Sequence, residues 1–176
     1  MASDLTPFSY CILALVGRGG AGPHDLARMM REGQGVWEAA RSQYYAEPKR
    51  LERLGYLESA KQPGKTTERT HYTLTDEGAA ALKEWLGQPT RYSRIQSEPA
   101  IHLLAADLVD DEVTLRSLAA MREQLAEISH GVAQAEARAH EIPHRERYLR
   151  INHSFFRALL KAHEDLIDSV EQELGS

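Results

Sequence analysis

The sequence predicts a mainly α-helical protein in two parts, and three observations lead to this prediction. Apolar residues recur at the spacing of helical turns near the N-terminus and again throughout the second half of the 176-residue chain. The region from Tyr45 to Gly87 departs from this pattern and reads as helix, hairpin, helix. A polar stretch follows Gly87. We therefore expect a domain over residues 1–90 that contains the hairpin, and an all-α domain over residues 91–176.

Two helices are expected before the hairpin region. Thr6 offers an N-cap hydroxyl, and Pro7 suits the first helical position. Glycines from Gly17 onward end this helix. Pro23 begins a second one, which should end at Gly33.

The helix–hairpin–helix segment is the most informative part of the chain. A basic helix is expected from Tyr45 to about Leu57, ended by glycine. Two β-like runs, residues 56–62 and 69–75, flank a turn, and Thr75 then caps a helix over residues 76–86. A helix followed by a two-stranded wing with a cationic tip is the arrangement that winged helix-turn-helix domains use on DNA.

The net charge of −5 is unevenly distributed. Residues 1–90 hold 11 basic and 11 acidic side chains, whereas residues 91–176 hold 10 and 15. From residue 38 to 75 there are 7 basic and 5 acidic residues, a local net charge of +2. Phosphate neutralisation acts over a Debye length of about 8 Å, so a modest local patch is compatible with DNA binding.

The basic helix and the wing supply the candidate DNA contacts. Lys and Arg suit phosphate contacts, whereas Ser42, Gln43 and Tyr45 suit base edges. The alternative is a solvated face with short-range ion pairs. Leu51 and Leu54 are expected on the apolar side, and Pro48, which costs about 3 kcal/mol inside a helix, predicts a kink. The candidates are Arg41, Ser42, Gln43, Tyr45, Lys49, Arg50 and Arg53 in the helix, and Lys65, Thr66, Thr67 and Arg69 in the wing.

The second half predicts two long helices that pack along their lengths. From Leu118 to Ala139 apolar residues follow a 3,4 repeat, and the last helix carries two neighbouring apolar rows. Apolar helix faces of this extent predict that a second chain covers them in a homodimer. The alternative is a helical hairpin in which the two helices of one chain cover each other. The candidate dimerisation residues are Leu118, Met121, Leu125, Ile128, Phe155 and Leu159.

Several functional classes lack support in the sequence. There is no apolar run of membrane-spanning length and no signal-peptide pattern, so we expect a cytoplasmic protein. The single cysteine, Cys11, and the scattered histidines form no convincing metal set. No phosphate loop, nucleophile elbow or paired-acid motif is present. We therefore expect no enzyme activity, no metal and no cofactor.

The chain resembles the PadR family of bacterial transcription regulators. The resemblance rests on Tyr45 with Lys49-Arg50-Leu51-Glu52, on Tyr72-Thr73-Leu74-Thr75 with Gly78, and on Leu82 with Trp85-Leu86. It implies a homodimeric DNA-binding regulator, a repressor that binds a palindromic operator and is released by a small aromatic effector. The alternative function is a winged helix used as a protein-interaction module without specific DNA binding, which the acidic net charge and Pro48 favour.

Overall fold

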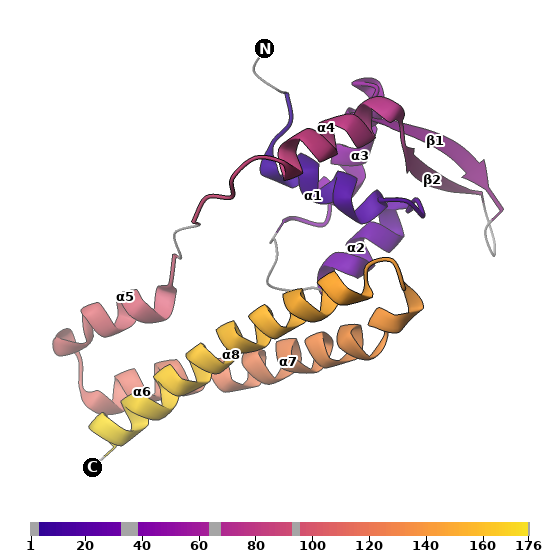
Figure 1. Cartoon of the computed structure of the whole chain (residues 1–176). Helices are drawn as coiled ribbons and strands as arrows, with labels where there is room; N and C mark the ends of the chain where they lie inside the picture. Colours follow the sequence, from indigo (N-terminus) through magenta and orange to yellow (C-terminus); the bar gives the residue numbers. More distant parts are fainter. Residues whose placement is uncertain (1–3, 33–38, 64–67, 93–95, 176) are drawn as a thin grey trace. The chain divides into compact units, whose positions relative to one another are not determined.

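The computed structural model describes residues 4–32, 39–63, 68–92 and 96–175. The chain divides into two compact units, residues 1–91 and 92–176 (Figure 1). The expected fold class is confirmed, because the described residues are mostly helical and the strands form one antiparallel pair.

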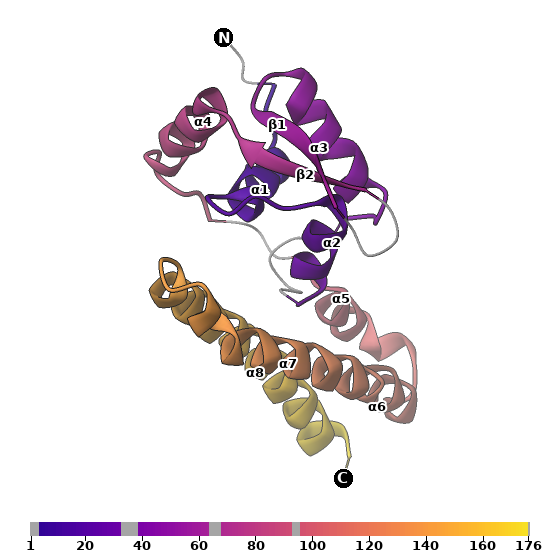
Figure 2. The same cartoon turned by 90° about the vertical axis from the view of Figure 1, so that its right-hand side faces the viewer.

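Unit 1 has the element order of a winged helix (Figure 2). Its elements are α1 (Pro7–Val16), α2 (Pro23–Glu32), α3 (Gln43–Arg53), β1 (Leu57–Gln62), β2 (Arg69–Leu74) and α4 (Asp76–Leu86). One buried cluster joins these elements, and its largest members include Ile12, Leu13, Leu26, Leu51 and Tyr72.

Local capping explains where the outer helices of unit 1 begin. Thr6 and Ser9 form a reciprocal capping box at the start of α1. The hydroxyl of Thr75 accepts from the backbone amide of Gly78 at 3.0 Å at the start of α4. Both caps were predicted from the sequence, and both are confirmed.

The wing is fixed to the core by backbone contacts. In the hairpin, Leu57 pairs with Leu74 and Gln62 with Arg69. Tyr72 also exchanges two backbone hydrogen bonds of 3.0 Å with Ala21, which extends the sheet toward the turn between α1 and α2. The wing therefore has a defined place beside the helices.

Helix α3 runs through Pro48, whose ring is fully buried. The expected start at Tyr45 lies two residues inside the helix, which begins at Gln43. Gly55, with φ of 80°, follows the helix in the left-handed conformation that glycine adopts most readily. Leu54 was expected on the apolar side, but it is 41% exposed, because it already belongs to the turn that leaves the helix.

Unit 2 consists of helices and short 3₁₀ turns. Its elements are α5 (Glu98–Leu104), η1 (Ala106–Leu108), α6 (Asp111–Ala119), α7 (Met121–Ala137), η2 (Ala139–Glu141) and α8 (Glu146–Leu174). Helix α8 packs along both α6 and α7 (Figures 1 and 2). The first of the two expected long helices, which carries the 3,4 repeat from Leu118 to Ala139, is therefore divided into two helices and a 3₁₀ turn.

The apolar row that begins at Leu118 is buried within one chain. Leu118, Leu125 and Val132 are at most 8% exposed, and Met121 and Ile128 are partly buried. The expectation that a second chain covers this row was wrong for Leu118 and Leu125. The reason is that α8 of the same chain covers the row, as in the helical hairpin that was the alternative.

His153 lies among the buried side chains of α8, and its Nδ1 atom has no hydrogen-bond partner among the described residues. Burial lowers the pKa of His153; the charge of Arg157 acts in the same direction, and that of Glu136 opposes it. The folded state therefore favours the neutral imidazole.

We predict that replacing Gly78 by alanine destabilises unit 1. A Cβ atom at this position would lie 2.0 Å from the backbone oxygen of Tyr56, so the junction between the hairpin and α4 must move. Such overpacking costs about 1–3 kcal/mol, which urea unfolding would detect. Gly19→Ala is the matched control, because its Cβ meets nothing within 4 Å. Equal stability of the two variants would contradict the prediction.

We also predict that unit 2 loses stability in mild acid. Because the folded pKa of His153 is lowered, its contribution is fully present above the ordinary value of 6.5 and is lost as the pH falls through the folded pKa. His153→Leu should reduce the difference in melting temperature between about pH 7.5 and pH 5. The exposed His144→Leu is the control and should leave that difference unchanged.

Candidate nucleic-acid interface

Helix α3 has one buried side and one exposed side. Tyr44, Pro48 and Leu51 are buried in the core of unit 1. The opposite side carries candidate contacts that the sequence predicted. Arg41, Ser42, Gln43, Lys49 and Arg53 are exposed, and Tyr45 is partly buried.

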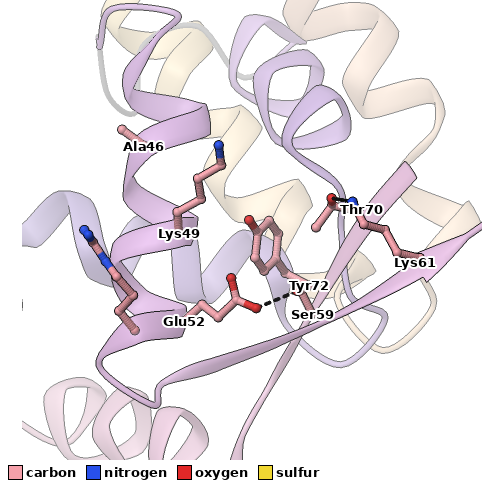
Figure 3. A pocket seen from close by; sticks show the side chains of 8 residues that line it. Ala46, Lys49, Glu52, Ser59, Lys61, Thr70 and Tyr72 are labelled. Carbon is pink, nitrogen blue, oxygen red and sulfur yellow. Dashed lines mark hydrogen bonds between the residues drawn. The ribbon is translucent and has the colours of Figure 1, made fainter. Parts of the chain in front are cut away.

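A groove lies between this exposed side and the wing (Figure 3). It is an open groove with a volume of about 590 Å³. Its lining comes from α3, β1 and β2: Ala46, Lys49, Glu52, Arg53, Ser59, Lys61, Thr70 and Tyr72. The structure thus brings side chains that are distant in the sequence together along one surface.

The groove is cationic although the protein is acidic. Three cations, Lys49, Arg53 and Lys61, line it against the single carboxylate of Glu52. Glu52 accepts a hydrogen bond of 2.5 Å from the Ser59 hydroxyl, and Lys61 donates to Thr70 at 3.1 Å. These bonds join α3 to β1 and β1 to β2, so they also hold the walls of the groove.

Tyr72 belongs to the lining and is almost fully buried. Burial raises the pKa of its hydroxyl, and the charge of Glu52 raises it further. The phenol therefore stays neutral at physiological pH and does not add negative charge to the groove.

The first residues of α3 present polar groups. The Gln43 side-chain oxygen accepts from the backbone amide of Ala40 at 3.1 Å, which leaves the amide nitrogen of that side chain as a donor. The Ser42 side chain makes no capping hydrogen bond. These two side chains and Tyr45 remain the candidates for base contacts.

Arg50 differs from the other predicted contacts. Its guanidinium group bonds to Glu47, Ser9 and the backbone oxygen of Asp4. This side chain is therefore engaged with α1 and the segment before it, and it does not line the groove. Its assignment as a phosphate contact finds no support in this placement.

The wing adds Arg69, which is exposed at the start of β2. The predicted contacts Lys65, Thr66 and Thr67 lie outside the described residues. Lys61 was missed at the sequence level. Successive strand residues alternate between faces, so Lys61 shares the face of buried Leu57, and this period of two was the signal for it.

Other kinds of site find no support among the residues that the structure describes. No group of three or more His, Cys, Asp or Glu side chains is arranged to hold a metal ion there. Within the same residues, no helix combines the length and apolar character needed to cross a bilayer.

The domain with this groove matches a known family. Residues 12–84 match the model of the transcriptional regulator PadR-like family. The negative transcriptional regulator PadR of Bacillus subtilis (strain 168) is 35% identical over 79 residues, which is 44% of this chain and 43% of that protein. The alignment thus spans less than half of that relative. Residues 12–84 form a PadR-like domain.

Solved structures share the fold of almost the whole chain. The PadR-like regulator BC1756 of Bacillus cereus has a TM-score of 0.73 and 14% identity, over 97% of this chain and 99% of that one. Bacillus subtilis PadR in complex with operator DNA has a TM-score of 0.66 and 20% identity, over 94% and 99%. The same protein in complex with p-coumaric acid has a TM-score of 0.59 and 19% identity, over 93% and 98%.

Proposed function

We propose that the chain is a homodimeric transcriptional regulator that binds double-stranded DNA. The observation that supports this function best is the cationic groove between α3 and the wing of a PadR-like domain. In this proposal α3 enters the major groove, which is about 12 Å wide, and the wing reaches the neighbouring backbone.

The proposed contacts divide by chemistry. Phosphates of the DNA strand that lies in the protein groove are bound by Lys49, Arg53 and Lys61. These contacts contribute affinity without reading sequence. Ser42, Gln43 and Tyr45, at the start of α3, contact base edges. The Bacillus subtilis protein in complex with operator DNA supports assigning DNA as the partner.

The proposed dimer uses unit 2, on a different side from the buried row. Three apolar residues of α8, Tyr148, Ile151 and Phe155, are 68%, 63% and 57% exposed in the single chain. Isolated exposed apolar residues are common, but a row of them along one long helix indicates a surface that another chain covers. Of the residues predicted for dimerisation, Phe155 belongs to this row.

A symmetric dimer presents two copies of α3, so its operator should be an inverted repeat. Half-sites should lie about 10 bp apart, or a multiple of that, to place both helices on one side of the duplex. We further propose that the protein acts in the cytoplasm as a repressor that a small aromatic molecule releases. The Bacillus subtilis PadR structures, with operator DNA and with p-coumaric acid, support this scheme.

We predict that Lys49→Ala, Arg53→Ala and Lys61→Ala each weaken DNA binding on every sequence. Each lost phosphate contact should lower the slope of log affinity against log salt by about 0.9. Fluorescence anisotropy on fragments selected from genomic DNA would measure both quantities. Lys83→Ala is the control, because this exposed lysine of α4 does not line the groove.

The same measurement distinguishes DNA binding from a protein-interaction module. Wild-type binding that weakens steeply with salt supports the regulator. The interaction module would be favoured if the wild-type protein bound no DNA fragment, or if its affinity for DNA did not depend on salt concentration.

We predict that Phe155→Glu separates the chains without unfolding them, because Phe155 is exposed in the single chain. Leu125→Glu should instead unfold unit 2, since an unpaired carboxylate there replaces a buried side chain. Sedimentation combined with circular dichroism would separate the two outcomes. Ser154→Glu, at an exposed neighbouring position, is the control for added charge. A monomeric wild type at micromolar concentration would refute the dimer.

A further inference from the structure

A polar network joins the middle of α3 to the first turn of α1. Arg50 donates to both carboxylate oxygens of Glu47, at 2.9 and 2.7 Å. It also donates to the Ser9 hydroxyl at 2.9 Å and to the backbone oxygen of Asp4 at 3.0 Å. Four of the five guanidinium N–H groups are thus used inside the protein.

Ser9 is the centre of this network and is fully buried. Its hydroxyl donates to Glu47 at 2.7 Å. It accepts from Arg50 and from the backbone amide of Thr6, the latter at 2.9 Å. Donor and acceptor capacity are both filled, and such a satisfied buried group favours one arrangement of its neighbours.

Electrostatics strengthen the contact. Burial alone would raise the pKa of Glu47, but hydrogen bonds from Arg50 and Ser9 and the charge of Arg50 outweigh it and lower the pKa. The Glu47 side chain is only 14% exposed, and the Arg50 side chain is 32% exposed. A bidentate pair that is shielded to this degree is stronger and more directional than a surface ion pair.

The network supplies what the apolar packing of α3 lacks. Tyr44, Pro48 and Leu51 hold the helix to the core, but apolar burial is non-directional and tolerates rotation about the helix axis. Hydrogen bonds from one point on α3 to α1 restrict that rotation. Lys49 is next to Arg50 in the helix, so the same restriction aims Lys49 into the groove.

We propose that Glu47 and Arg50 are positioning residues, which fix the rotation of α3 against α1 through Ser9, and that Arg50 is not a phosphate contact. The effect on DNA rests on the proposed function, whereas the anchoring itself does not. The proposal makes Glu47 an acidic residue that DNA binding requires.

The first test needs no DNA. Glu47→Ala, Arg50→Ala and the double variant are unfolded by heat and followed by circular dichroism, with Lys49→Ala as the control on the same helix. Each single anchor variant should lower the melting temperature by about 3 °C or more, and the double variant should add little to the larger single effect. Lys49→Ala should leave stability unchanged, because Lys49 is exposed and the hydrogen bonds of the network join other residues.

The second test measures binding to the selected DNA at a temperature where every variant is folded. Glu47→Ala should weaken binding about tenfold, the scale of one lost charge-assisted hydrogen bond, although it removes a negative charge. Glu84→Ala, the same change at an exposed position of α4 that does not line the groove, should not weaken binding. Arg50→Ala should weaken binding with an unchanged salt slope, whereas Lys49→Ala should lower the slope by about 0.9.

Arg50→Lys separates the two roles of the arginine. A lysine keeps the charge that a phosphate needs but cannot make the bidentate contact, so anchoring predicts only partial rescue relative to Arg50→Ala. Full rescue, tighter binding by Glu47→Ala or a lowered salt slope in Arg50→Ala would identify a phosphate contact instead. If the destabilisation of the double variant equalled the sum of the two single effects, this result alone would overturn the proposal that Glu47 and Arg50 anchor α3. If wild type bound no DNA, the proposed function would fail, and the unfolding test would still decide the anchoring.

Discussion

The packing of α3 on α1 is the contact on which the arrangement of unit 1 depends. Tyr44, Pro48 and Leu51 bury one side of α3, so the polar side must face outward. The network around Ser9 then adds direction, because it bonds α3 to one turn of α1. Only with α3 held in this way do Lys49 and the wing form two walls of one groove. An internal ion pair and an external cationic surface are thus built from neighbouring residues of the same helix.

The charge of the whole protein and the charge of this surface differ in sign. The chain carries −5, yet three cations and one carboxylate line the groove. Screening limits the reach of each charge to about 8 Å, so the acidic residues of unit 2 need not cancel the local field. The carboxylates of α3 also have protein partners: Glu47 bonds to Arg50, and Glu52 accepts from Ser59. The net charge therefore does not describe the charge of this surface, which the placement of a few side chains sets.

Features with local causes were readable from the sequence. Thr6 and Thr75 cap helices by bonding to residues three positions later, and Gly55 follows α3 with the positive φ that glycine adopts readily. The order of helix, hairpin and helix followed from such signals. The candidate contacts in the α3 segment and the wing were proposed from residue type and position. Most of those in α3 lie on its exposed side. Gly78, recognised only as part of a family pattern, has a physical cause in the structure, since the backbone of Tyr56 leaves no space for a side chain.

By itself, then, the sequence determined the helices, the hairpin and the polar side of α3, because caps, turns and periodicity act within a few residues. Only the tertiary structure decided which partner each side chain meets. In the sequence Arg50 resembles its cationic neighbours. In the structure its guanidinium group donates a hydrogen bond to the buried Ser9, 41 positions away. Lys61 enters the groove because the hairpin folds beside α3, and Leu125 is buried because α8 returns along α7. Periodicity can show that a face is apolar or charged, but it cannot say which chain or helix covers it, since burial depends on contacts between distant segments.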